Sequence, residues 1–479
     1  MSKKRAKIAI VGGGIAGASI ANYLSAFDLE VTLFEKQKSL VNGPPICHLH
    51  AGGNLYREIS DSQCVQLLEE SIELVQLYPC AVEFRPTLIA TPIEDKSDPQ
   101  ALFPRLALLQ KHYKFLVSKN IQNRVLGNPE NYYKLYSKED VIALKNTQNS
   151  EKLFGFDRWM FRALQLIDTG RLKFPLVMVQ EYGLNVFRLA ASVTLLLEDK
   201  KNVKILRQTE VKSIKKLENR YHIVAMQSEK KIEGSFEYLI NAAGFISGEI
   251  DDMLGFKRER YVEFKAAYVT HWRSGLKLPE IIFHGERGTP QGMAQFTPYH
   301  DGYFQLHAMT EDITLFRDGL VKSHLCCSAQ PKLDAKYIKK IYKGWRKADV
   351  VSRAELAIEH MTQFIPSFKD AKVSLKPLFG AQQIPGDDAS LRAAEVSFEG
   401  ERYARCEIVK ASSVLSMADS ISKKLIALGY VSQEMYGVRN FENLSLFLEE
   451  EVTELAQKLC EERAYPKALA FRDNSTVII

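Results

Sequence analysis

The feature that most constrains the fold is a glycine pattern close to the amino terminus. The run KIAIV is apolar and rich in β-branched residues, as buried strands are. Gly12, Gly14 and Gly17 follow in the order G-x-G-x-x-G and lead into a small-residue helix expected over 18–27. The run EVTLFEK then predicts a second strand that ends at Glu35. A strand, these glycines, a helix, a second strand and an acid are together typical of a dinucleotide-binding βαβ unit.

Each residue of this unit has a physical task. Gly12 permits a tight turn, Gly14 lets the backbone approach a pyrophosphate, and Gly17 allows the helix to pack closely on the sheet. The start of the helix supplies N–H donors and the positive end of a dipole for the phosphates. Glu35 can accept hydrogen bonds from the ribose hydroxyls.

The glycine pattern alone does not distinguish NAD from FAD, and two other features favour FAD. The segment FEYLINAAGFISGEI predicts a strand that ends in Ala243 and Gly244, where a small-residue backbone can press against a ligand. More than 400 residues follow the first pattern without a second glycine fingerprint, so no separate NAD site is visible.

Chain length and net charge limit the number of domains and the kinds of partner that we expect. A chain of 479 residues exceeds one compact core, so we expect two packed domains or one domain with a large insertion. The net charge is +6 without a block of five or six basic residues, so no nucleic-acid arm is expected. The mild positive charge leaves attraction to an acidic substrate or to an anionic membrane surface open.

The seven cysteines show no C-x-x-C pair and no metal-ligand spacing, so we expect reduced structural thiols and no metal site. No run of 18 apolar residues occurs, so no transmembrane segment is expected. The expected location is the cytoplasm, with peripheral contact at the inner face of the membrane left open.

Along most of its length the sequence resembles the D-amino-acid-oxidase-like (DAO) family of FAD-dependent oxidoreductases. VGGGIAGASIANYL with VTLFEK resembles the FAD fingerprint of the family, and YLINAAGFISGEIDDMLG resembles its later Ala-x-Gly strand. QEYGLNVFRLAASVTLLLE, residues 180–198, is similar to the helix before its small antiparallel element. ARCEIVKASSVLSMADSISKKLI, residues 404–426, is similar to its final strand and helix, which cap the flavin ring.

At one point the sequence departs from the usual pattern of this family, and the departure indicates which branch it resembles. Ala411, Ser412 and Ser413 stand where glycine is usual. Small and hydroxyl residues at this point resemble the 2-hydroxyacid dehydrogenase branch, which includes L-2-hydroxyglutarate dehydrogenase and malate:quinone oxidoreductase.

The resemblance implies an α/β fold: a Rossmann-like FAD-binding domain of the glutathione-reductase type with an interleaved α+β substrate domain built on an antiparallel sheet. The implied segments are 1–90, 176–255 and 376–430 for the FAD-binding domain, 91–175 and 256–375 for the substrate or cap domain, and 431–479 for a C-terminal helical extension.

The residues give local support to this division. RYVEFKAAYVTHW, EIIFHGE, GMAQFTPYHDGYFQLHAM and ITLFR are aromatic-rich runs that predict strands of the antiparallel sheet. ALFPRLALLQKHYKFLVSKN has helical spacing, and Ser137 to Asp140 resembles a capping box. An amphipathic helix is expected over 440–463, packed against the body of the protein.

The segment SLVNGPPICHLHAGGNLYREIS crowds glycines, prolines and histidines just after the βαβ unit. In the family this segment passes over the flavin, and its His-x-Gly pattern is His50-Ala51-Gly52 here. Glycines let an aromatic ring lie against the backbone. His48 and His50 could bond flavin carbonyls or accept the hydroxyl proton of an alcohol, or simply bond a neighbouring carbonyl.

The expected site residues are as follows. The cofactor contacts are Gly12, Gly14, Ile15, Ala16, Gly17, Glu35, Lys36, His50, Ala51, Gly52, Val211, Ala243, Gly244, Ser412, Ser413 and Val414, and the candidate catalytic residues are His50, His48, Lys265, Arg287 and Arg392.

The three cationic residues are candidates for the catalytic site for different reasons. An arginine suits a substrate carboxylate, and Arg287 is the first choice and Arg392 the second, although each could be a solvated surface residue. Lys265 lies on an apolar strand, where a lysine is costly unless it is paired. Oxygen-reducing relatives often keep a lysine over the flavin, while an edge-strand surface lysine is the alternative.

The expected activity is an FAD-dependent oxidoreductase, a dehydrogenase or oxidase that removes a hydride from a carbon bearing a hydroxyl or amino group. The expected substrate is small and carries a carboxylate, and the electrons pass to quinone or another acceptor. The alternatives are an oxygen-using amine or amino-acid oxidase, an FAD-dependent RNA-modification protein, and a non-catalytic FAD-stabilised scaffold. Substrate identity, electron acceptor, covalent or non-covalent flavin and oligomeric state do not follow from the residues.

Overall fold

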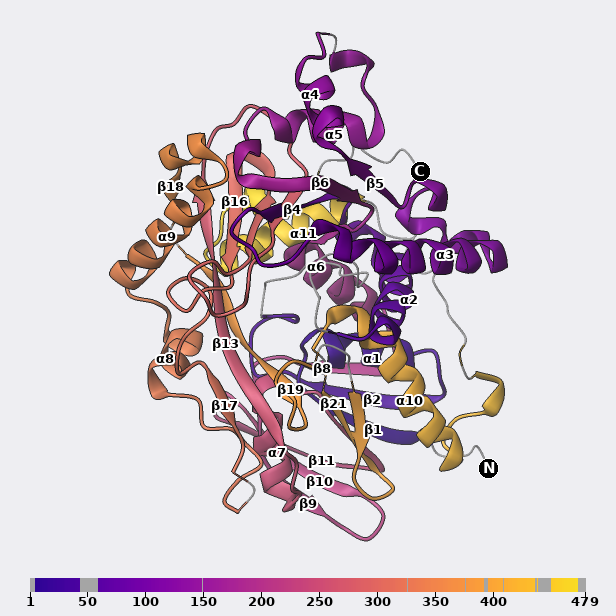
Figure 1. Cartoon of the computed structure of the whole chain (residues 1–479). Helices are drawn as coiled ribbons and strands as arrows, with labels where there is room; N and C mark the ends of the chain where they lie inside the picture. The colour runs from indigo at the N-terminus through magenta and orange to yellow at the C-terminus, as the bar shows by residue number, and fades with distance from the viewer. Residues whose placement is uncertain are drawn as a thin grey trace.

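The computed structural model describes residues 5–43, 59–148, 150–324, 326–374, 376–391, 395–407, 409–435, 437 and 449–472. Two large sheets dominate it (Figure 1). The mixed α/β architecture with a separate antiparallel sheet confirms the predicted fold class.

The first sheet contains the βαβ unit. Its strand order is β20-β21-β12-β1-β2-β8, and all neighbours are parallel except β20 and β21. The strands are β1 (Ala6–Val11), β2 (Leu29–Phe34), β8 (Val203–Leu206), β12 (Tyr238–Asn241), β20 (Glu395–Phe398) and β21 (Tyr403–Glu407).

Alternate residues of β1 pack against different layers. Ile8 and Ile10 join the core shared with helices α1 (Ile15–Leu24), α6 (Val186–Glu198) and α10 (Val414–Ala427). Ala9 and Val11 face the opposite way, towards the three-stranded sheet β9 (Thr209–Lys216), β10 (Tyr221–Gln227) and β11 (Lys230–Phe236). Because both faces are covered, the strand is apolar and buried from Ile8 to Val11, as its sequence predicts.

The second sheet has ten strands, and of its strand pairs only β4 and β14 run parallel. Its order is β17-β13-β16-β15-β14-β4-β6-β5, with β18 and β19 also paired to β13. The strands are β4 (Thr87–Pro92), β5 (Tyr133–Tyr136), β6 (Leu172–Val179), β13 (Arg260–His271), β14 (Glu280–Phe283), β15 (Ala294–Pro298), β16 (Tyr303–Ala308), β17 (Leu320–Lys322), β18 (Lys372–Val373) and β19 (Leu378–Pro385).

The two faces of this sheet differ in character. Phe264, Tyr268 and Phe296 belong to an apolar core that also contains buried residues of helices α8 (Ala335–Lys343) and α9 (Lys347–Thr362). Successive residues of a strand point to opposite faces, so Lys265 and the residues paired with it lie on the other side. That side carries many polar groups and packs partly on the core of the first sheet.

The remaining helices are α2 (Asp61–Leu77), α3 (Phe103–Lys119), α4 (Lys138–Lys145), α5 (Gly155–Leu164), α7 (Ser247–Leu254) and α11 (Glu449–Glu462), with a short strand pair β3 (Val82–Glu83) and β7 (Gly183–Leu184). The capping box of α4 is confirmed: Asp140 N donates to Ser137 Oγ at 3.1 Å, and Ser137 N donates to Asp140 Oδ2 at 2.8 Å.

Two local predictions differ from the structure. Helix α1 begins at Ile15 rather than at 18, because Ala18 N already donates to Gly14 O at 2.9 Å. The run ITLFR is a turn and not a strand. Thr314 Oγ1 accepts a hydrogen bond from Ala308 N at 3.0 Å and bends the chain back onto β16.

The predicted domain boundaries cut through the second sheet. They assign β19 to the FAD-binding domain, whereas its ladder joins it to β13 along eight residue pairs. Strand β4 also begins inside the predicted first segment. The division into domains stays a prediction.

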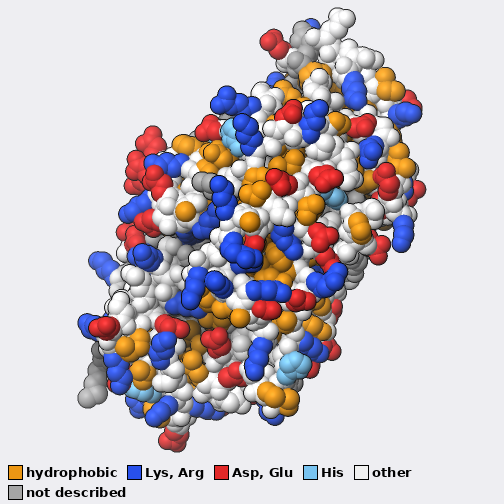
Figure 2. Space-filling model, turned by 90° about the vertical axis from the view of Figure 1, so that its left-hand side faces the viewer, with side chains coloured by type: hydrophobic (Ala, Val, Ile, Leu, Met, Phe, Trp, Pro, Cys, Tyr) orange, Lys and Arg blue, Asp and Glu red, His pale blue; other side chains and the backbone are white. Residues whose placement is uncertain are grey.

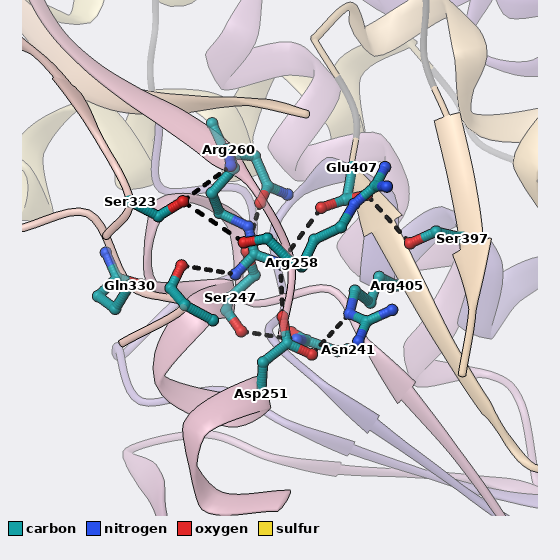
Figure 3. A network of polar contacts seen from close by, with 12 residues as sticks. Asn241, Ser247, Asp251, Arg258, Arg260, Ser323, Gln330, Ser397, Arg405 and Glu407 are labelled. Atoms are coloured by element: carbon teal, nitrogen blue, oxygen red, sulfur yellow. Dashed lines mark hydrogen bonds and ion pairs between the residues drawn. The ribbon is translucent and has the colours of Figure 1, made fainter. Parts of the chain in front are cut away.

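A buried ionic network joins the two sheets (Figure 3). Asp251 of α7 pairs with Arg260 of β13 and with Arg405 of β21, whose Nε lies 2.6 Å from Asp251 Oδ1. Glu407 of β21 pairs with Arg260 at 3.3 Å and with Arg258 at 2.8 Å. Buried ion pairs therefore connect the long strand β13 to the first sheet.

No helix in the described part of the chain combines the length and apolar character needed to cross a bilayer. Within the same residues, no group of His, Cys, Asp or Glu side chains is arranged to hold a metal ion.

Candidate functional site

A cavity of about 480 Å³ lies where the glycine turn, helix α6 and strand β19 of the second sheet meet. Its lining includes many of the predicted cofactor contacts: Gly12, Gly14, Ile15, Ala16, Glu35, Lys36, Val211, Ala243, Gly244 and Ser412. Residues far apart in the chain therefore line one cavity.

The three fingerprint glycines have different surroundings. Gly12 has φ +106°, and a methyl group there would lie 2.2 Å from the carbonyl oxygen of Ala242. A methyl group on Gly17 would lie 1.9 Å from the carbonyl oxygen of Gly12, so Gly17 serves helix packing and does not line the cavity. A methyl group on Gly14 would meet no atom within 4 Å. The open space beside Gly14, at the start of α1, fits a pyrophosphate.

Glu35 lies at the end of β2 and is 7% exposed. Its Oε2 accepts a hydrogen bond from Gly13 N at 2.7 Å, and its Oε1 accepts one from Gln37 N at 2.6 Å. Burial raises the pKa of this carboxyl group, and the two N–H donors oppose that shift. Each oxygen retains a lone pair, so the carboxylate can also accept from two ribose hydroxyls.

Another part of the lining comes from the turn Ala411–Ser413, which leads into α10. Ser412 lines the cavity, whereas Ser413 Oγ donates to Glu70 of α2 and Val414 is fully buried. The structure thus places Ser413 and Val414 behind the turn, where they hold it in position.

Sequence reasoning missed three cavity residues: Lys376, which precedes β19, and Arg463 and Tyr465 near the end of the chain. Arg463 follows α11 and donates to Leu40 O at 2.8 Å and to Val41 O at 3.0 Å. Lys376 Nζ donates to the Arg463 carbonyl at 2.6 Å, and burial, with the Arg463 charge, lowers the pKa of this lysine. Nothing in the sequence marks these residues, because their position depends on where α11 docks.

The polar face of the second sheet brings two candidate cations together. Lys265 Nζ lies 2.8 Å from Glu263 Oε2, and Arg287 pairs with the other oxygen of the same carboxylate. Gln382 Nε2 donates to Glu263 at 3.3 Å and lines the cavity, as Lys410 does. Lys265 and Arg287 are therefore neighbours of the cavity wall and not part of it.

A buried chain of hydrogen bonds adjoins these cations. Glu280 accepts from Gln295 Nε2 and, at 3.1 Å, from Thr297 Oγ1. Because a carboxylate only accepts, Gln295 must turn its amide nitrogen to Glu280 and its Oε1 to His307 Nδ1, 3.3 Å away. His307 is therefore held with its proton on Nδ1.

The other ring nitrogen, His307 Nε2, is buried and has no hydrogen-bond partner among the residues that the structure describes. Burial, together with the charges of Lys265 and Arg287, lowers the pKa of His307 to about 3. The imidazole is thus a neutral acceptor, and nearby cations contribute to keeping it neutral.

Several predicted site residues, His48, His50, Ala51, Gly52 and Arg392, lie outside the described residues. Their assignment as site residues stays a prediction.

Three comparisons with known proteins bear on this site. A family model described as FAD dependent oxidoreductase (DAO) matches residues 7–376. No curated protein matches the chain.

Several solved structures share the fold. The L-amino acid deaminase from Proteus vulgaris has a TM-score of 0.57 at 12% identity, covering 93% of this chain and 98% of that one. The L-proline dehydrogenase from P. horikoshii has a TM-score of 0.56 at 17% identity, covering 90% and 96%. The glycerol-3-phosphate dehydrogenase from Bacillus halodurans, complexed with FAD, has a TM-score of 0.55 at 12% identity, covering 98% and 74%.

Proposed function

Because the chain belongs to the DAO family of FAD-dependent oxidoreductases, we propose that it oxidises a small carboxylate-bearing substrate at a carbon that carries a hydroxyl or amino group. When bound, FAD would supply the acceptor for the hydride. In this proposal Gly14 and Glu35 hold the pyrophosphate and ribose, and the turn at Ser412 meets the ring; the cavity that these residues line supports it.

The observation that carries the proposal is the charge on the polar face of the second sheet. The charges of Lys265, Arg287 and Lys410 all lower the pKa of His307, and the charge of Glu263, which pairs with Lys265 and Arg287, opposes them. A site with this excess of positive charge favours a substrate carboxylate, and it disfavours an ammonium group.

We infer that the substrate reaches past the cavity wall to His307, which is buried and does not itself line the cavity, and that this histidine favours a hydroxyl group at the reacting carbon. Its Nε2 lone pair can accept a hydrogen bond from an alcohol, which would satisfy an otherwise unpaired buried atom. Because the pKa of His307 is low, its role is to orient the hydroxyl, and proton removal falls to another group. His50 and His48 remain the candidates for that role.

The test is an anaerobic titration of purified holoenzyme against panels of hydroxyacids, amino acids and polyol phosphates. We expect a hydroxyacid to bleach the flavin absorbance near 450 nm. We expect His307→Leu to raise KM by about tenfold or more, because the variant loses one hydrogen bond to the substrate and leaves a cavity. His307→Gln keeps an acceptor and should recover part of the affinity. Bleaching by none of the three panels would contradict the proposal.

An oxygen-using amine or amino-acid oxidase is the second candidate. Lys265 supports an oxidase activity. This lysine is largely buried beside the cavity wall, and a cation at such a position favours the reduction of oxygen. Steady peroxide release with amino acids, abolished in Lys265→Met, would select this activity. Reduction of a quinone analogue without peroxide would select the dehydrogenase.

A further inference from the structure

Positive charge is concentrated at one place on the surface. Seven of the sixteen residues from 332 to 347 are lysine or arginine and one is aspartate, which leaves +6, equal to the net charge of the whole chain. Figure 2 shows the side of the molecule that carries α8 and α9, with Lys and Arg side chains gathered around its middle.

Helix α8 separates its charged and apolar residues. At about 100° per residue, Lys336, Lys339, Lys340 and Lys343 fall within one arc of about 100°, which we call the lysine stripe. Tyr337 is 4% exposed and packs, with Ile338 and Ile341, into the core beneath the second sheet. The buried residues occupy the opposite arc, so the lysine stripe points to solvent.

Part of this charge is not neutralised within the protein. Lys336 pairs with Asp318 at 2.8 Å, and Lys340 pairs with Asp349. Lys339 and Lys343, with Lys332 and Lys347 at the flanks, have no ion pair in the described part of the chain and are exposed.

Apolar side chains lie exposed on α8 itself and on β17 and α9. Tyr342 of α8 is 42% exposed, Leu320 of β17 is 41% exposed and Leu356 of α9 is 40% exposed. Lysines with an aromatic flank match the interface of an anionic bilayer. Arginine is the usual residue for nucleic-acid phosphates, whereas six of the seven cations here are lysine.

We propose that the lysine stripe and its flanking lysines dock the protein on the surface of a membrane rich in anionic lipid. The same helix contributes Ile341 and Tyr342 to the cavity lining, so docking would hold the cofactor cavity next to the bilayer. An electron acceptor dissolved in the membrane could then reach it. The proposal does not depend on which substrate is oxidised.

Vesicle co-sedimentation of the full-length holoenzyme tests this. We expect binding to phosphatidylcholine vesicles that contain about 30% phosphatidylglycerol, no binding to pure phosphatidylcholine, and release at about 0.5 M salt. Replacing Lys339, Lys343 and Lys347 by Gln should weaken binding on the order of 100-fold, because each lysine near such a surface contributes about a fivefold factor.

The matched control replaces Lys111, Lys119 and Lys138, which are exposed on α3 and α4. This variant should bind vesicles like the wild type, and both variants should keep the FAD spectrum and the melting temperature. Absence of binding to anionic vesicles, or equal weakening by the two triple variants, would overturn the proposal. Tighter binding to RNA than to vesicles at equal salt would overturn it in favour of a polyanion partner.

Discussion

At the residue scale, Gly14 and Gly17 belong to one turn but serve different purposes. An added methyl group on Gly17 would meet the Gly12 carbonyl, whereas one on Gly14 would meet open space. Gly17→Ala should therefore destabilise the cofactor-free protein by about 1–3 kcal/mol. Gly14→Ala should leave that stability unchanged and weaken FAD retention, because the methyl group occupies the space beside the phosphates.

Urea denaturation of apoprotein and flavin release on dilution measure the two effects separately. Equal loss of apoprotein stability in both variants would show that the space beside Gly14 is not reserved for a ligand.

His307 makes stability depend on pH. Its pKa is about 3 in the folded protein against an ordinary 6.5, so folding excludes a proton that the unfolded chain binds. The stabilising contribution is complete above pH 6.5 and is lost as pH falls towards 3, at about 1.4 kcal/mol per pH unit. His307→Gln should flatten the decline of the unfolding free energy between pH 6.5 and 5.

The control for this measurement is His300→Gln, which changes an exposed histidine. The His300 variant should follow the wild-type curve. A His307 variant with the wild-type slope would mean that the imidazole is hydrated in solution.

At the scale of elements, the segment that follows α11 contributes Arg463 and Tyr465 to the cavity lining. Arg463 donates to Ser39 Oγ and to the carbonyls of Leu40 and Val41, just after Glu35. Arg463→Ala would leave these carbonyls without a donor, at a cost of about 1–3 kcal/mol for each buried group. We expect faster FAD release, measured by the return of flavin fluorescence after dilution.

Lys467→Ala is the matched control, because Lys467 lies on the same C-terminal segment and forms an exposed pair with Glu461. Its FAD release should equal that of the wild type. Unchanged release in the Arg463 variant would show that α11 does not support the cofactor.

At the scale of the whole molecule, the network around Asp251 connects the two sheets (Figure 3). Asp251→Asn would remove the charge opposite Arg260 and Arg405, both fully buried, and should lower the unfolding free energy by about 3–5 kcal/mol. Glu399→Gln, at the partly exposed end of the same network, should cost less than about 1 kcal/mol. Chemical denaturation followed by far-ultraviolet circular dichroism measures both; equal costs would show that solvent reaches the network.

The distribution of positive charge also differs between the sequence and the folded molecule. In the sequence, the net charge looks evenly spread, and the basic residues of 332–347 are interrupted by apolar ones. Folding into α8 buries Tyr337 with Ile338 and Ile341 and leaves the lysine stripe on one side. A helix turns a dispersed pattern into a surface because residues three or four apart become neighbours.

Local interactions are what the sequence by itself determined. The glycine turn, the buried strand β1, the helix α3 and the capping box of α4 all depend on residues within a few positions of one another, so their pattern is readable in order. The family follows from the same segments. The tertiary structure alone decided that Arg463 lies beside Leu40, that Lys265 and Arg287 share Glu263, and that Glu280 sets the tautomer of His307. Those pairings join distant parts of the chain, and their geometry depends on how whole sheets and helices pack, which no local pattern encodes.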